Sequence, residues 1–453
     1  MLSDKEVMNA AEAITRAYLT SLFSPPPTGA RARTSQKHSF HFLSLIVQGQ
    51  QVPLLPHGTA VGDEMQTLRG RCSELLRYDA QALHVLCCVV NMVQEGLLCT
   101  ERDVYYRNTE LFPNGQRDTH CSIERLCRWM SCVCPLPPAS SAGERRRYTR
   151  EDLRIGASGK SILLGNLAFD IPTVSATSTS LVSGGAQELP TCVPSAKVPS
   201  VEVNAKHHIS GVLVSTTLGL HAHNFRAAGA GRGNGVTAAL VVVEKESTLH
   251  TLADVKSALG SESISDRCAY LCSKGYPCRA SRLFLRSLHR ELPELPILVL
   301  VDGDPHGLRI ALTFMGLFGE DINRGRRCQP AERVPELSTS VVAALLPIRW
   351  VGVRPSCLSH DNKGRAPLTE HDRRVLKQVI QRAKAALEGL PGTGSSFPLG
   401  QYCVGGGSAE DIIRVTLDEM LREAEWMQMM ETKCCLQAYV EGPLRLIIDF
   451  LHR

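Results

Sequence analysis

Residues 297 to 307 read Ile-Leu-Val-Leu-Val-Asp-Gly-Asp-Pro-His-Gly. An uninterrupted run of Ile, Leu and Val predicts a parallel strand that is buried on both faces. Ligands of open α/β sheets bind at the carboxyl ends of such strands, so Asp302 and Asp304 are expected at that edge with their side chains pointing the same way. A helix over residues 308 to 318, opened by Pro305, is expected to follow. The spacing Asp-x-Asp-x-x-Gly alone is a weak indication of a metal site, because ordinary turns also contain it.

A second apolar run, Ala-Leu-Val-Val-Val at residues 239 to 243, predicts another buried strand and ends at Glu244. Three carboxylates from two strand ends offer the hard oxygen ligands that Mg2+ prefers. The plainer alternative is that Glu244 and Lys245 are solvated residues beyond a strand. The presence of both strands favours the metal site.

Residues 100 to 112 begin with Thr-Glu-Arg-Asp, in which an acidic residue three positions after Thr100 is typical of a helix start. At about 100° per residue, four side chains of this segment fall on one apolar arc: Val104, Tyr105, Leu111 and Phe112. Tyr106 lies on the opposite arc with Arg102 and Glu110, so its phenol is expected to point outward beside a guanidinium. An outward tyrosine alone is more often an ordinary surface residue than a nucleophile.

Composition limits the class of protein. The chain has 453 residues, 43% of them apolar, which predicts two or three domains with real hydrophobic cores. A net charge of +5 permits an anionic partner without arguing for one. The 17 cysteines lack the paired spacing of a zinc site and are expected to be reduced thiols. The first residues resemble neither a secretory signal nor a transit peptide, and no apolar run approaches about twenty residues, so a soluble protein without a membrane partner is expected.

The predicted organisation has four parts in chain order: an N-terminal helical tail (1–65), a winged helix-turn-helix domain (66–170), a flexible linker (171–204) and an α/β domain with C-terminal helices (205–453). In the first part, residues 5 to 22 predict an amphipathic helix that could serve a partner. Helical segments at 82 to 98 and 121 to 133, with the Thr100 helix between them and short strand-like pieces after them, favour a winged helix, which places a helix in the DNA major groove. Residues 171 to 200 are rich in Ser, Thr, Pro and Gly, a composition typical of a linker. After about residue 205 strands alternate with helices, which predicts a mostly parallel sheet.

Together these segments resemble the meiotic double-strand-break transesterase family, which is homologous to the A-type chain of DNA topoisomerase VI. The resemblance covers residues 70 to 450 and rests on four motifs in the family's order: Thr-x-Arg-Asp-Val-Tyr-Tyr (100–106), Val-Glu-Lys (243–245), Lys-Gly-Tyr-Pro (274–277) and Asp-Gly-Asp-Pro-His-Gly (302–307). Residues 153 to 166 and a helix expected over 433 to 438 are also similar. The chain departs from the family at Cys278 and Ser281, and residues 325 to 335 read as an insertion.

The resemblance implies a Toprim-type α/β metal-binding domain beside the winged helix. It also implies that the Tyr106 oxygen attacks a DNA phosphodiester, releases the 3′ hydroxyl and leaves a covalent 5′-phosphotyrosyl link, as in a type IIB topoisomerase. Arg102, one turn earlier, is expected to stabilise the charge that develops. The expected Mg2+ ligands are Glu244, Asp302 and Asp304. The residues expected to contact the DNA backbone are Lys160 and Arg282.

Cutting both strands of double-stranded DNA needs two nucleophiles, and one convincing tyrosine per chain predicts a homodimer. The resemblance further implies composite active sites, accessory recombination proteins, an ATPase-like B subunit, and a nuclear location. Three alternatives stay open: a chain of a topoisomerase, a non-catalytic DNA-binding scaffold, and an unrelated metal-dependent nuclease or primase.

Overall fold

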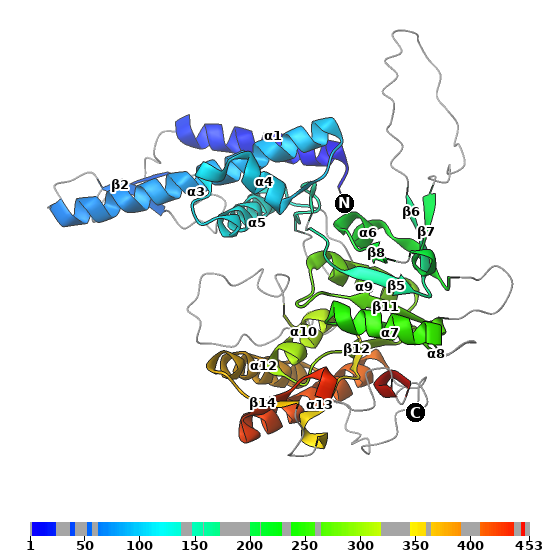
Figure 1. Ribbon diagram of the computed structural model, residues 1–453. Coiled ribbons are helices and arrows are strands. Elements are labelled where there is room, and N and C mark those ends of the chain that lie inside the picture. The colour runs from blue at the N-terminus through cyan, green and yellow to red at the C-terminus, as the bar shows by residue number, and fades with distance from the viewer. Residues whose placement is uncertain are drawn as a thin grey trace, which may run out of the picture. The chain divides into compact units, whose positions relative to one another are not determined.

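The computed structural model divides the chain into two compact units, Met1–Ser158 and Gly159–Arg453 (Figure 1). The structure describes residues 2–23, 37–40, 52–56, 62–136, 147–156, 158–172, 200–208, 210–228, 237–258, 264–318, 345–358, 364–390, 408–438 and 445–448. The insertion predicted at 325–335 lies outside these residues. Within the described part of the chain, no helix combines the length and apolar character needed to cross a membrane.

The first unit is built mainly from helices: α1 (Asp4–Phe23), α3 (Gly62–Glu95), α4 (Glu101–Arg107), the 3-10 helix η1 (Thr109–Leu111) and α5 (Gln116–Val133). Two pairs of short strands accompany them: β1 (Lys37–Phe40) antiparallel to β2 (Val52–Pro56), and β3 (Cys99–Thr100) parallel to β4 (Ile155–Gly156). The helices predicted over 82 to 98 and 121 to 133 are confirmed within α3 and α5. The winged-helix topology itself stays a prediction.

The amphipathic helix predicted over residues 5 to 22 is confirmed as α1, but it is not a separate tail. Its apolar side chains recur at helical spacing, and four of them are buried in the core of the first unit: Val7, Ala10, Ala11 and Ile14. The helix packs against α3 and α5. The Leu2 amide donates to Asp152 at 3.2 Å, and Arg154 pairs with Asp4. The sequence pattern identified the apolar face correctly and did not reveal that the same unit covers it.

The second unit contains a six-stranded sheet in the order β13-β12-β10-β11-β5-β8. Four neighbouring strands are parallel, as predicted: β13 (Ile348–Trp350), β12 (Ile297–Leu300), β10 (Ala239–Val243) and β11 (Cys268–Cys272). Two antiparallel strands, β5 (Ile162–Gly165) and β8 (Val212–Leu213), extend one edge. Leu240 and Val242 face the core beneath α9 (Arg279–Glu291) and α10 (Pro305–Met315), whereas Val241 and Val243 face the core beneath α7 (Glu246–Ala258). Burial on both faces explains the continuous apolar runs.

The second unit also contains two smaller sheets: the three-stranded sheet β7-β6-β9 (Ser200–Asn204, Ala168–Pro172, His223–Arg226) and the pair β14 (Arg365–Pro367) and β15 (Thr432–Cys434). Its other α-helices are α6 (Thr216–His221), α8 (Ile264–Arg267), α12 (Glu370–Gly389) and α13 (Ala409–Met430). Three 3-10 helices complete the described part of this unit: η2 (Ala205–His207), η3 (Pro355–Cys357) and η4 (Leu436–Ala438). The helix predicted over 433 to 438 is therefore wrong in its first half. Residues Thr432–Cys434 form a strand that pairs with β14, and only Leu436–Ala438 are helical.

The predicted linker over 171 to 204 also differs from the structure. Its two ends belong to neighbouring antiparallel strands, with Ile171 opposite Val201, while residues 173 to 199 lie outside the described chain. The stretch thus joins two strands of one sheet and does not join the two units, which divide between Ser158 and Gly159. The first domain was predicted to end at residue 170, later than the boundary in the structure, because the prediction included β5 and β6 in that domain. Composition shows where a regular pattern is missing but not which elements the segment connects.

We predict that Ile14→Ala destabilises the first unit by about 2 to 5 kcal/mol, because the removed side chain is fully buried. Hydrogen exchange monitored in α5 peptides should show a matching loss of protection. Leu19→Ala in the same helix is the control, since that side chain is 48% exposed and should change protection little. Equal protection in Ile14→Ala and wild type would mean that α1 is a dispensable tail.

Candidate functional site

Two neighbouring parallel strands bring acidic residues to one edge of the sheet. In the register of β10 and β12, Val243 lies opposite Leu300. Glu244 and Asp302 follow the ends of these strands, and Asp304 precedes α10 as its N-cap. The predicted strands that carry these carboxylates are thus confirmed. The helix predicted after them is present as α10, which begins at Pro305 and ends at Met315.

Glu244 carries the clearest electrostatic signature of the cluster. Burial, followed by the negative charges of Asp302 and Asp304, raises the pKa of its carboxyl to about 7. Lys245 and a backbone hydrogen bond at Asp302 act in the opposite direction without cancelling this effect. Among the described residues, the buried Oε2 atom of Glu244 has no hydrogen-bond partner. This edge of the sheet therefore concentrates negative charge that is incompletely compensated.

The two aspartates have different partners. The Asp302 side chain is buried; its Oδ1 atom accepts a hydrogen bond from the Leu436 amide at 2.9 Å, and its Oδ2 atom lies 2.5 Å from Lys245 Nζ. Asp304 Oδ1 accepts from the Gly307 amide at 2.6 Å and so caps α10. Burial raises the pKa of Asp304, and the Gly307 hydrogen bond does not offset it. This cap uses one of the two Asp304 oxygens.

Two glycines of this motif are required by close backbone approach. A Cβ atom at Gly303 would collide with Cys434 Sγ and the Val353 carbonyl oxygen, and one at Gly307 would collide with the Asp302 backbone. Gly303 also forms an isolated bridge to Cys434, whose amide donates to the Gly303 carbonyl at 2.9 Å. Glycine is therefore required at position 303, in the turn between the two aspartates, and at position 307, in the first turn of α10.

The carboxylates suit a divalent cation in chemistry and charge. All three offer hard oxygen atoms, and the partnerless Glu244 Oε2 and the raised pKa of Glu244 both indicate that a cation would be stabilised here. Within the described chain, however, no three His, Cys, Asp or Glu side chains form a ready-made metal-holding group. Asp302 is the carboxylate already engaged on both oxygens.

The loop after β11 folds over the end of β10 beside this cluster. The Ser273 amide donates to Val243 O at 2.9 Å, and the Gly275 amide donates to Glu244 O at 3.0 Å. Lys160 Nζ donates to Lys274 O at 3.1 Å. The structure thus places Lys160 against the loop that adjoins Glu244. This contact of Lys160 was not expected from the sequence.

Arg282 lies in the first turn of α9, directly after the same loop. Cys278 is the N-cap of this helix but makes no side-chain capping hydrogen bond. Ser281 Oγ instead donates to the Cys278 carbonyl at 2.8 Å. The two departures from the family pattern therefore contact each other, and they leave Arg282 in the helix that follows the motif.

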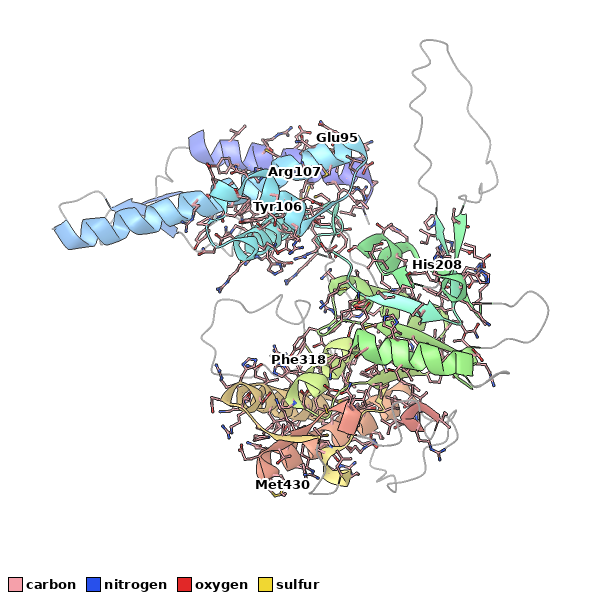
Figure 2. The ribbon with its side chains drawn as sticks, in the orientation of Figure 1. Glu95, Tyr106, Arg107, His208, Phe318 and Met430 are labelled. Carbon is pink, nitrogen blue, oxygen red and sulfur yellow. The ribbon has the colours of Figure 1, made fainter. Side chains whose placement is uncertain are left out.

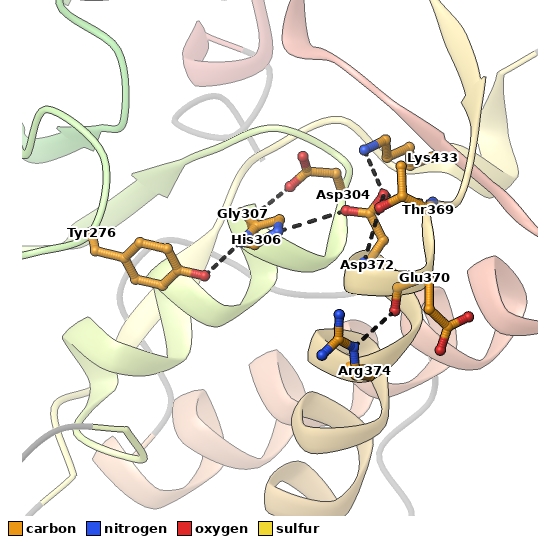
Figure 3. A network of polar contacts seen from close by, with 9 residues as sticks. All are labelled: Tyr276, Asp304, His306, Gly307, Thr369, Glu370, Asp372, Arg374 and Lys433. Carbon is orange, nitrogen blue, oxygen red and sulfur yellow. Dashed lines mark hydrogen bonds and ion pairs between the residues drawn. The ribbon is translucent and has the colours of Figure 1, made fainter.

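A chain of polar contacts next to the cluster was not found by sequence reasoning (Figure 3). The Tyr276 hydroxyl lies 2.7 Å from His306 Nδ1, His306 Nε2 lies 3.6 Å from Asp372 Oδ1, and Lys433 Nζ lies 2.7 Å from Asp372 Oδ2. Burial acts to raise the pKa of Asp372, but hydrogen bonds from Lys433 and Thr369 outweigh it and lower the pKa to about 2. Tyr276 and His306 lie inside the quoted motifs, whereas the other members belong to the C-terminal helices and strands.

Tyr106 lies on α4 in the first unit (Figure 2). Its side chain is 66% exposed, while Val104 on the same helix is fully buried, so the predicted orientation of the phenol is confirmed. Arg102 is also exposed, one turn earlier. The helix is shorter than predicted, since it ends at Arg107, and Glu110 falls in η1 and not on the same helical face.

The start of α4 is firmly anchored. Thr100 and Asp103 form the predicted capping box, with the Asp103 amide donating to Thr100 Oγ1 at 3.3 Å and the Thr100 amide donating to Asp103 Oδ2 at 2.7 Å. Glu101 pairs with the buried Arg150 at 2.8 Å, and Arg150 also contacts His120 Nδ1 at 2.7 Å. Two sets of contacts thus fix the helix that presents the exposed tyrosine.

Both candidate regions match models of known protein families. Residues 239–327 match the family model of the Toprim domain that Spo11 shares with the A-type chain of topoisomerase 6, and residues 78–134 match the family model described as "Type IIB DNA topoisomerase". The first match contains the three carboxylates, and the second contains α4 with its tyrosine.

Curated relatives agree with these matches. The chain is 25% identical over 303 residues to the A3 chain of DNA topoisomerase 6 of Oryza sativa subsp. indica, covering 66% of this chain and 51% of that protein. It is 22% identical over 311 residues to the meiotic recombination protein SPO11 of Mus musculus (67% and 59% covered) and 24% identical over 307 residues to that of Homo sapiens (66% and 58% covered). The alignments thus span between half and three fifths of these relatives. The chain contains a Toprim domain of the type found in Spo11 and in the A-type chain of topoisomerase 6, and it is related to that family.

Proposed function

We propose that this protein forms double-strand breaks in DNA by Mg2+-dependent tyrosine transesterification and thereby initiates meiotic recombination. The observation that carries the proposal is that one chain has both an exposed tyrosine, Tyr106, on a well-anchored helix of the first unit and an incompletely compensated carboxylate cluster at the end of two parallel strands of the second unit. The tyrosine falls within the segment that matches type IIB topoisomerases, and the cluster falls within the Toprim match.

In the proposed reaction the Tyr106 oxygen attacks the phosphorus atom of a DNA phosphodiester. A phosphorus–oxygen bond to the tyrosine forms as the bond to the 3′ oxygen breaks, so the phenol loses a proton and the leaving oxygen gains one. An ordinary phenol is protonated at neutral pH and needs nearby positive charge or a base for activation. Arg102, exposed one turn before Tyr106, supplies a guanidinium for the developing charge. The product is a 5′-phosphotyrosyl link that conserves the energy of the broken bond.

The proposed Mg2+ ligands are Glu244, Asp302 and Asp304. When bound, the cation would orient the scissile phosphate and screen its charge. Lys160 and Arg282 are proposed to contact the DNA backbone. Lys160 donates to Lys274 O in the loop that adjoins Glu244, and Arg282 lies in the first turn of α9, which follows this loop. Lysine and arginine are the usual partners of phosphate oxygens.

The proposed assembly is a homodimer, because one chain carries one tyrosine in this role and two strands must be cut. We propose double-stranded DNA as substrate, accessory recombination proteins and an ATPase-like B subunit as partners, and the nucleus as the site of action. The names of the relatives, which include both meiotic recombination proteins and a chain of topoisomerase 6, support this range of partners.

A topoisomerase VI-like A-type chain is the second candidate function, since a relative of that kind is matched over the same share of the chain as the human meiotic protein. Relaxation of supercoiled DNA together with an ATPase partner would distinguish it. A non-catalytic scaffold is disfavoured by retention of Tyr106, Arg102 and the carboxylates. An unrelated nuclease or primase would leave no covalent adduct.

We predict that Tyr106→Phe abolishes covalent protein–DNA adducts trapped under denaturing conditions, because only the nucleophilic oxygen is removed. DNA binding should persist. Tyr105→Phe is the matched control: its ring is half-buried, 6.4 Å from the Phe112 ring, and adduct formation should continue. Adducts that persist in Tyr106→Phe would refute the assignment of the nucleophile.

We predict that Asp304→Asn raises the Mg2+ concentration needed for half-maximal cleavage at least about tenfold. Asparagine can still accept the Gly307 hydrogen bond and cap α10, so thermal stability should change little. Asp411→Asn, at the start of α13, is the control for loss of an acidic residue near a helix N-terminus. An unchanged Mg2+ titration in Asp304→Asn would exclude this ligand.

We predict that Glu244→Gln stabilises the metal-free protein at alkaline pH. The pKa of Glu244 is about 7 in the folded state against an ordinary value of 4.5, so the folded state binds the proton more tightly than the unfolded state. The stabilisation that comes from this tighter proton binding by Glu244 is fully present below pH 4.5 and is lost as the pH rises through about 7. In EDTA, thermal unfolding should show Glu244→Gln to be more stable than wild type by about 1 to 3 kcal/mol at about pH 8, with no such advantage at about pH 4.5. A difference that does not depend on pH would contradict this assignment.

A further inference from the structure

The ammonium group of Lys245 forms an ion pair with Asp302, one of the three proposed metal ligands. Lys245 Nζ lies 2.5 Å from Asp302 Oδ2, and Asp302 Oδ1 already accepts the Leu436 amide at 2.9 Å. Asp302 is only 8% exposed, so solvent contributes little to the stabilisation of its carboxylate. A cation that binds Asp302 through Oδ2 therefore competes with the Lys245 ammonium for this oxygen.

Two other lysines near this edge, Lys274 and Lys433, have acidic partners outside the cluster. Lys274 Nζ lies 3.0 Å from Glu246 Oε1, and Lys433 Nζ lies 2.7 Å from Asp372 Oδ2. The charge of Lys245 also acts on Glu244, where it lowers the pKa of the carboxyl against the larger effect of burial. Lys245 pairs directly with Asp302, whereas the buried Glu244 Oε2 atom has no hydrogen-bond partner among the described residues.

We propose that Lys245 is an internal counter-cation, which holds Asp302 in the metal-free protein and leaves it when a divalent cation binds. This inference rests on the proposed function for the identity of the three ligands. The side chain of Lys245 is 38% exposed, and its four-carbon stem is flexible, so the ammonium can move to solvent without disturbing the core. The lysine keeps the carboxylates together before the metal arrives and weakens metal binding by competing for one of them.

Because Lys245 and the metal compete for Asp302, replacement of the lysine should change metal affinity in a predictable direction. Removing the lysine charge removes a repulsion of the incoming cation and a competitor for Asp302, so metal affinity should rise. The metal-free protein should at the same time become less stable, since the carboxylates lose their paired ammonium. A lysine that served only packing would not increase the affinity for metal when replaced by a side chain of similar length.

The test uses the full chain stripped with EDTA and titrated with Mn2+ alone, followed by calorimetry and by the paramagnetic resonance of free Mn2+. Lys245→Met should bind Mn2+ at least about tenfold more tightly than wild type, a discounted value for a partly exposed charge a few ångströms from the ligand. Its thermal unfolding temperature should fall without metal and rise more than that of wild type when Mn2+ is added. Lys274→Met is the matched control, because the Lys274 side chain is about as exposed as that of Lys245 (35% against 38%) but pairs with Glu246 outside the cluster; it should change Mn2+ affinity less than about twofold.

The outcomes separate this inference from the proposed function. If wild type binds no Mn2+, or if Asp304→Asn binds it as well as wild type does, the assignment of the metal ligands fails. If those two proteins behave as proposed but Lys245→Met binds Mn2+ with equal or lower affinity, the counter-cation role of Lys245 is refuted. Should Lys245→Met not fold, Lys245→Gln keeps a polar end at the same position and supports the same comparison.

Discussion

The pairing of β10 with β12 is the constraint on which the candidate site depends. Because these strands are parallel neighbours in fixed register, the residues that follow them emerge together at one edge, and Glu244 is held within reach of the charge of Asp302. Burial then makes that repulsion costly. The fold therefore holds carboxylates that repel one another at this edge of the sheet, and a hard cation bound there would relieve the repulsion. The glycines of the following turn allow the backbone to approach closely enough to keep this arrangement.

The helix that carries Tyr106 is organised on a different principle. Its orientation comes from local contacts at its first turn, a capping box and the ion pair of Glu101 with Arg150, together with the burial of Val104. These contacts leave the phenol exposed at the surface of its unit. The proposed nucleophile needs such exposure to reach an external phosphodiester, whereas the proposed metal ligands need burial to concentrate their negative charge.

Sequence reasoning succeeded where the signal was local. Continuous apolar runs predicted β10 and β12, and the Thr-x-x-Asp pattern predicted the start of α4, because both depend on residues that are close in the chain. It failed where the deciding contact is distant. The Leu436 amide that holds Asp302 comes from 134 residues away, and no periodicity or motif encodes that approach. The supposed linker was misplaced for a related reason, since its composition carries no information about the pairing of Ile171 with Val201.

The segment from Thr432 to Leu436 supports the site from outside the matched Toprim region. It supplies an ammonium to Asp372, a backbone bridge to Gly303 and an amide to Asp302. A premature stop codon or an altered splice junction shortly before this segment would spare every residue of the quoted motifs. It would nevertheless remove the backbone contacts of Cys434 with Gly303 and of Leu436 with Asp302. A protein cut just before Thr432 would therefore keep the quoted motifs but lose the contacts that hold Asp302 and Gly303 in place.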